Sequence, residues 1–82
     1  MRTRKQPYGN KNLVGQHIEQ LRKNRNIKQK DLIMQLQQFG IDMNASSLSK
    51  LEGQIRFVSD FELVALSNVF GVTIDELLQN NQ

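Results

Sequence analysis

Hydrogen-bonding side chains follow one another in the run NASSLSK, from Asn44 to Lys50. A serine hydroxyl donates and accepts, so it can pair with either kind of group on the edge of a nucleic-acid base, and the long Lys50 side chain can donate to a guanine edge or a phosphate. Ala45 offers only a methyl contact, suited to thymine. The run contains no carboxylate that would repel a polyanion. The residues predicted to contact base edges are Asn44, Ala45, Ser46, Ser47, Ser49 and Lys50.

Catalytic and metal-binding chemistry has few candidate residues in this chain. There is no cysteine and a single histidine, His17, so thiolate metal sites, thiol nucleophiles and His-containing triads lack their components. The sequence has no phosphate-cradling glycine loop and no paired carboxylates in an evident pocket. We therefore expect a protein that is not an enzyme and that needs neither metal nor cofactor.

Two helices are predicted to position the polar run. Apolar residues at helical spacing, Leu32, Ile33 and Leu36, with Phe39 a turn later, predict a helix over Gln29–Phe39 that stops at Gly40. Asn44 is a good N-cap for a second helix that ends at Glu52. In that helix Leu48 and Leu51 form the buried face, so the polar residues between them face outward.

Three further helices complete the expected fold, which is all-α with five helices in one domain, residues 12–80. Val14, Ile18 and Leu21 predict a helix over Leu13–Asn24 with Asn12 as its N-cap, and Gly15 should weaken it by up to about 1 kcal/mol. Capping boxes predict the other two starts, and they pair Ser59 with Glu62 and Thr73 with Glu76. The resulting helices, Asp60–Phe70 and Ile74–Gln79, are expected to be the apolar central helix and a short last helix.

Charge divides the chain into two unequal halves. Met1–Lys30 has nine basic residues and one acid, a net +8, whereas Asp31–Gln82 has two basic residues and seven acids, a net −5, which together give the overall +3. The basic half indicates an anionic partner such as nucleic acid, with improved solubility as the plainer alternative. Residues 1–11 are interpreted as a flexible basic arm in which Tyr8 packs on the domain or stacks on a base.

The chain should also be soluble and cytoplasmic. Its basic N-terminal residues lead into no apolar run of secretory length, and no stretch approaches the roughly 20 apolar residues that a membrane span needs. The absence of cysteine is compatible with a reducing compartment.

Three segments together resemble the Cro/repressor-type (Xre) helix-turn-helix family of bacterial and phage DNA-binding proteins. They are LRKNRNIKQKDL, SLSKLEGQ and ELVALSNVFGVTIDELL, in this order, and the resemblance extends over about residues 13–78. The resemblance implies a lambda-repressor-like fold and transcriptional regulation, with repression as the expected mode, by dimers on palindromic double-stranded DNA. It also implies that Gln29 contacts the DNA backbone and can brace the base-reading helix. Arg22 and Glu52 match an Arg–Glu pair of the family. We expect a partly shielded structural pair that also aims Arg22 at a phosphate, with a surface pair worth roughly 0–1 kcal/mol as the plainer alternative.

Basic and polar residues beside the polar run complete the expected site. The residues predicted to bind phosphates are Arg2, Arg4, Lys5, Arg22, Gln29, Lys30 and Arg56. Two features depart from the family pattern. The connection LQQFGIDMNA between the two central helices is longer by a few residues than in the best-known relatives, and the predicted reading face has alanine and serines where relatives often have Gln or Arg. A homodimer remains open, with the last helix and the loop around Phe57 as candidate contacts. The alternative function is a protein-binding adaptor or antitoxin-type regulator that holds a partner protein through the same two regions.

Overall fold

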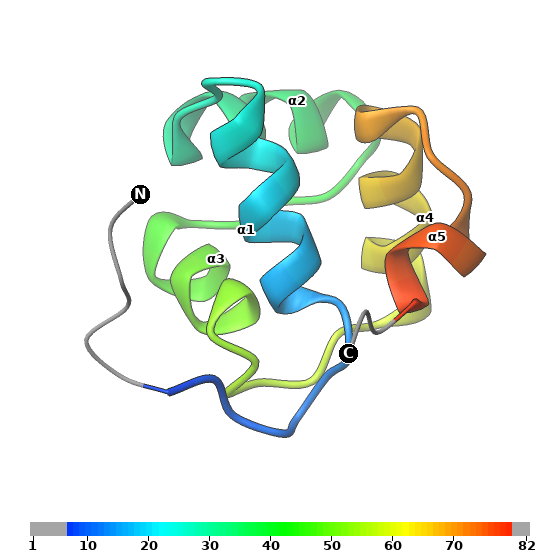
Figure 1. Cartoon of the computed structure of the whole chain (residues 1–82). Coiled ribbons are helices and arrows are strands. Elements are labelled where there is room, and N and C mark those ends of the chain that lie inside the picture. The colour runs from blue at the N-terminus through cyan, green and yellow to red at the C-terminus, as the bar shows by residue number, and fades with distance from the viewer. Residues whose placement is uncertain (1–6, 80–82) are drawn as a thin grey trace.

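The computed structural model describes residues 7–79, and within that range the chain forms five helices and no strand (Figure 1). The helices are α1 (Gly15–Asn24), α2 (Gln29–Gln38), α3 (Ala45–Glu52), α4 (Asp60–Phe70) and α5 (Ile74–Leu78). In the view of Figure 1, α1 crosses the molecule with α3 on one side of it and α4 and α5 on the other. The all-α class expected from the sequence is confirmed, and none of the described helices is long and apolar enough to span a bilayer.

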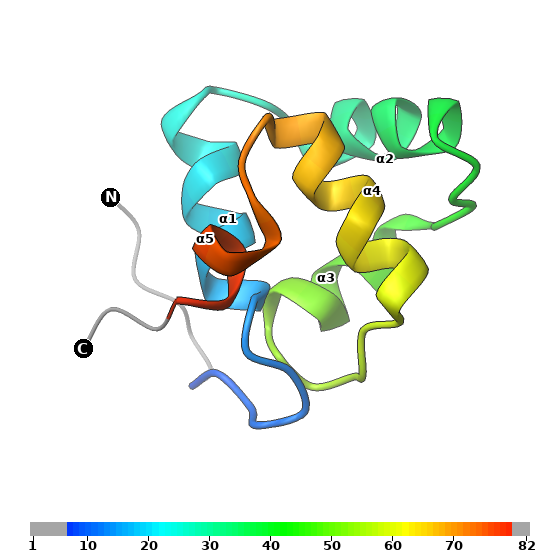
Figure 2. The same ribbon diagram turned by 90° about the vertical axis from the view of Figure 1, so that its right-hand side faces the viewer.

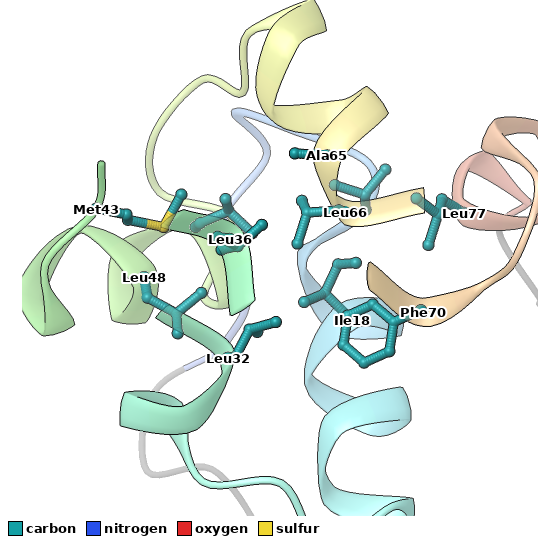
Figure 3. Packing of buried hydrophobic residues seen from close by; sticks show 11 residues of the cluster. Ile18, Leu32, Leu36, Met43, Leu48, Ala65, Leu66, Phe70 and Leu77 are labelled. Atoms are coloured by element: carbon teal, nitrogen blue, oxygen red, sulfur yellow. The ribbon is translucent and has the colours of Figure 1, made fainter. Parts of the chain in front are cut away.

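One apolar core joins all five helices (Figure 3). Ile18 of α1, Leu36 of α2 and Leu66 of α4 are fully buried at its centre. Leu48 and Leu51, the predicted inner face of α3, are also fully buried. Since a buried leucine contributes about 1.5–3 kcal/mol, these two residues hold the short α3 against the rest of the domain.

The helix starts follow the local sequence closely. The Asn44 side chain accepts a hydrogen bond from the Ser47 N–H at 2.8 Å, and α4 and α5 each begin with a complete capping box, as predicted. Gly40 follows α2 with a positive φ of 83°, which suits a residue without a side chain. The ends differ slightly from expectation, because α2 stops at Gln38 and α5 at Leu78.

α1 begins two residues later than predicted, at Gly15 instead of Leu13. The Asn12 side-chain oxygen, Oδ1, accepts hydrogen bonds from the Val14 and Gly15 N–H groups, which organises a turn ahead of the helix. The Asn12 amide donates to the carbonyl oxygens of Leu51 and Arg56. Asn12 therefore fastens the start of α1 to the end of α3, a long-range role that capping preference alone does not indicate.

The segment predicted to be a flexible arm, residues 1–11, is held against the domain in its last part. The Gly9 N–H donates to the Gly53 carbonyl at 2.8 Å and the Lys11 N–H donates to the Gln54 carbonyl at 2.9 Å. Tyr8 is half-buried, and its hydroxyl donates to Glu19, so it packs on the domain. Residues 7–11 thus lie along the end of α3, and the rest of the predicted arm, residues 1–6, falls outside the described range.

α4 is not apolar core on most sides, contrary to the prediction. Leu66 and Phe70 are buried, but Phe61 is 78% exposed and Val64 is 47% exposed. They lie beside Phe39, itself half exposed, in an open groove of about 590 Å³ between the end of α2 and α4. We call this surface the α2–α4 groove. Its other lining residues are Gly40, Ile41, Ala65 and Asn68.

Candidate nucleic-acid interface

The outer face of α3 carries the polar run that the sequence indicated. Ala45, Ser46, Ser49 and Lys50 are exposed, and Ser47 is partly exposed. Asn44 is exposed too, but its side-chain oxygen is already used to cap the helix. In Figure 1, α3 lies at the edge of the molecule away from α4 and α5, so the fold leaves this face open. This face offers serine hydroxyls and the Lys50 ammonium for hydrogen bonding and the Ala45 methyl for apolar contact, and the Ser49 hydroxyl also lies within hydrogen-bond distance of Gln29.

The one acid of α3 is neutralised inside the protein. Glu52 is 1% exposed, and it accepts hydrogen bonds from Arg22 Nε at 2.7 Å and Arg22 Nη2 at 3.1 Å. This two-point geometry pairs the planar guanidinium with the carboxylate. Because the Glu52 charge is compensated and buried, the exposed face of α3 presents no negative charge.

Arg22 itself is directed inward and does not reach the surface as the predicted phosphate ligand. It is 8% exposed, and its Nη1 donates to the Ile27 carbonyl at 2.9 Å in addition to the two bonds with Glu52. Of the two roles expected for Arg22, structural pairing and phosphate binding, the geometry fits only the structural one. The physical reason is that an unpaired Glu52 would be costly in this position, so Arg22 is held there.

Gln29 connects the start of α2 to the outer face of α3. Its amide nitrogen donates to Glu52 Oε1 at 3.0 Å and lies 3.3 Å from the Ser49 hydroxyl. The brace that the resemblance implied is therefore present, whereas a phosphate contact of Gln29 stays a prediction. The neighbouring Lys28 and Lys30 are exposed, so two ammonium groups lie at the α2 end that touches α3. Lys28 was missed by the sequence reasoning, although its position next to Gln29 could have indicated it.

Arg56 is the second predicted phosphate ligand that the structure directs elsewhere. Each N–H donor of its guanidinium has an acceptor within the protein. The partners are Met43 Sδ, the carbonyl oxygens of Ser47 and Phe57, and both carboxylate oxygens of Glu62. Arg2, Arg4 and Lys5 lie outside the described residues. Of the two remaining residues predicted to bind phosphates, Gln29 contacts α3, and Lys30 is exposed in the first turn of the same helix as Gln29.

Glu62 combines two structural contacts that affect its titration. Burial raises the pKa of Glu62, but hydrogen bonds from Arg56 and from Ser59, together with the Arg56 charge, outweigh it, and the pKa lies below its ordinary value. The carboxylate is thus favoured in the folded state, where it holds Arg56 and completes the α4 capping box.

Acid should therefore destabilise the domain partly through Glu62. A carboxyl group whose folded pKa is lowered contributes stability above its unfolded pKa, and that stability is lost as the pH falls through the folded pKa. We expect the free energy of unfolding to decrease below the ordinary glutamate range, and Glu62→Gln to show a shallower decrease. Urea unfolding between about pH 7 and about pH 3 measures this difference. Identical pH profiles for both proteins would contradict it.

Comparison with known proteins found no family model and no curated protein that matches this chain. Among the described residues there is also no cluster of three or more His, Cys, Asp or Glu side chains that could hold a metal ion. The chemistry of the α3 face therefore has to be interpreted from its own residues.

Proposed function

We propose that this protein binds double-stranded DNA in a sequence-specific manner and regulates transcription, with α2 and α3 acting as a helix-turn-helix and α3 entering the major groove. The observation that carries the proposal is the outer face of α3, which is polar, exposed and free of acids, and which Gln29 joins to the start of α2, where Lys28 and Lys30 are exposed. A major groove admits one α-helix, and base edges there pair with such hydroxyl and amine groups. Membership of the Cro/repressor-type family and repression as the mode of regulation belong to the same proposal.

Positioning and base contact are divided between different groups in this proposal. Lys28, Lys30 and the free N–H groups at the start of α2 bind phosphates and fix the register of the protein on the duplex. Ser46, Ser49 and Lys50 meet base edges, with the partly exposed Ser47 beside them. The basic residues Arg2, Arg4 and Lys5 add phosphate contacts on the grounds of sequence and charge alone.

Two copies of the domain fit the function better than one. A single α3 meets few base pairs, and related motifs bind half-sites roughly 34–36 Å apart through two-fold symmetric dimers. We therefore propose a homodimer on a palindromic site, which blocks transcription by occupying it.

The direct test is electrophoretic mobility shift on random duplex at low salt, followed by selection of bound sequences. The expected result is a shift that weakens steeply as salt is added, because phosphate contacts release condensed counterions. Selected sequences should converge on a motif with two-fold symmetry. If the folded protein does not shift duplex at low salt, the proposed function is wrong.

Removal of the Lys50 side chain tests the base-reading assignment. In the variant Lys50→Ala we expect the preference for the selected motif over random duplex to fall by about tenfold, because a good side-chain contact to a base is worth roughly 1–3 kcal/mol of discrimination. Competition binding at fixed salt measures this ratio. Lys23→Ala is the control of equal charge, since Lys23 lies on α1 and pairs with Glu19 at 3.3 Å. An unchanged preference in Lys50→Ala would remove Lys50 from the base-reading set.

A second candidate function is binding of a partner protein, as in an adaptor or antitoxin-type regulator. The α2–α4 groove favours it, because exposed phenylalanines beside a concave surface are typical of protein contacts. Phe57 is 74% exposed as well, although the Lys11 ammonium lies 5.4 Å from its ring centre. A protein of this kind without DNA affinity would leave random duplex unshifted.

A further inference from the structure

Arg56 joins the base-reading helix to the helix that follows it. It lies in the loop between α3 and α4, which in Figure 2 runs along the lower edge of the molecule and leads up to the first turn of α4. Arg56 Nε donates to the Ser47 carbonyl in α3 at 3.1 Å, and Nη1 donates to the Phe57 carbonyl in the loop at 2.7 Å. Nη1 and Nη2 each lie 3.0 Å from an oxygen of Glu62 in α4. One side chain therefore contacts three consecutive segments.

Glu62 is itself held in place by the start of α4. Its carboxylate accepts the Ser59 N–H at 2.9 Å, and the Ser59 hydroxyl accepts the Glu62 N–H at 3.1 Å, which completes the capping box. The Arg56 and Glu62 side chains are only 21% and 19% exposed, so solvent screens their attraction less than at an open surface. A movement of α3 relative to α4 has to break these directional bonds.

The core alone constrains α3 less completely. Its buried face rests on Leu48 and Leu51, and it packs chiefly on α1 and α2. Apolar contacts oppose separation of the helix from the core, but they are not directional, and so they resist small rotations and shifts weakly. Charge-assisted hydrogen bonds to a fixed guanidinium have a defined geometry and restrict such movements.

We propose that Arg56 is a positioning residue for DNA recognition, which sets the orientation of α3 through Ser47 and Glu62 and does not itself bind a phosphate. The inference rests on the proposed function and adds to it a pair, Arg56 and Glu62, that determines how accurately α3 meets the bases. Arg56 places no donor at the DNA because all of its donors are used within the protein.

Glu62→Gln separates positioning from phosphate binding, because the two roles predict opposite signs. If Arg56 binds a phosphate, loss of a nearby negative charge should free the guanidinium and tighten DNA binding. If Arg56 positions α3, the same change should weaken binding to the selected motif, by about tenfold for a coupled pair of this kind. Glutamine still completes a capping box, so α4 keeps its start.

The experiment compares Arg56→Lys, Glu62→Gln and the double variant with the parent by competition binding on the selected motif, at a temperature where unfolding curves show every protein folded. We expect each single variant to lose about tenfold in affinity with an unchanged salt slope. In Arg56→Lys the reason is that lysine cannot form the forked contact with Glu62, and in Glu62→Gln it is that the carboxylate partner is lost. The double variant should lose no more than either single one. Glu76→Gln is the matched control, since Glu76 has the same capping-box position in α5 and its carboxylate is bonded to Thr73; it should bind as the parent does.

Amide hydrogen exchange on the DNA-free proteins provides an independent readout. In Glu62→Gln the amides of α3 should exchange faster by about tenfold, while those of α5 stay unchanged. Equal or tighter DNA binding in Glu62→Gln overturns the proposal, and so does weaker binding with a reduced salt slope in Arg56→Lys. If the parent binds no duplex, the proposed function fails, and exchange in α3 then decides separately whether the pair holds the helix.

Discussion

Replacement of Glu52 by alanine is expected to lower the free energy of unfolding by about 3–5 kcal/mol, because it leaves the buried Arg22 guanidinium without its counter-charge. Arg22 is 8% exposed and would keep only its bond to the Ile27 carbonyl. Gln29 would also lose its carboxylate acceptor. Since small domains are stable by only about 5–15 kcal/mol, such a loss brings the protein close to unfolding.

Urea unfolding at neutral pH measures this effect, and Asp75→Ala is the matched control. Asp75 is an exposed acid in α5, so its removal should change stability by no more than about 0.5 kcal/mol. At low temperature, where some Glu52→Ala protein is folded, DNA affinity should fall too, because the α2 brace and the end of α3 share Glu52. If Glu52→Ala loses no more free energy of unfolding than Asp75→Ala does, the Arg22–Glu52 pair behaves as an ordinary surface ion pair.

Gly15→Ala is expected to destabilise the domain by about 3 kcal/mol, although alanine is the better helix former. A Cβ atom at this position would lie 2.1 Å from the Leu51 carbonyl oxygen and 2.8 Å from that of Glu52. Both atoms belong to the backbone of α3, so they cannot move aside without displacing the helix. Overlap therefore exceeds the gain of up to about 1 kcal/mol in helix propensity.

Thermal unfolding is a suitable measurement, since a loss of 1 kcal/mol in stability lowers the unfolding midpoint by about 4–8 °C in a domain of this size. Gln20→Ala provides the control, because Gln20 is an exposed residue of the same helix and should shift the midpoint little. A higher midpoint for Gly15→Ala would mean that α1 and α3 are farther apart than the structure places them. The variant should also weaken DNA binding, because the displaced helix is α3.

The local parts of the fold were predictable because their causes lie within a few residues of one another. The N-cap at Asn44 and the capping boxes of Ser59 and Thr73 each satisfy N–H groups two or three positions ahead, so sequence alone located these starts. Helical spacing likewise identified Leu48 and Leu51 as the buried side of α3, and hence the serines and Lys50 as its outer side. The exposed polar face was therefore contained in the sequence.

The direction of long side chains was decided by the tertiary structure. Arg22 and Arg56 are basic in the sequence like Lys30, yet both turn inward. Arg22 bonds Glu52, 30 residues away, and Arg56 bonds Ser47 and Glu62 in the two helices that flank its loop. Gly15 looked like a weak point of one helix, and it is the place where α3 crosses closely. The exposure of Phe61 also depends on the tertiary structure, because it is set by which sides of α4 the other helices cover. Caps and helical periodicity act over one turn, whereas Arg22 and Glu52, 30 residues apart, meet only when the chain is folded. The sequence therefore determined the helices and the polar face, and the fold determined which charged side chains stay exposed.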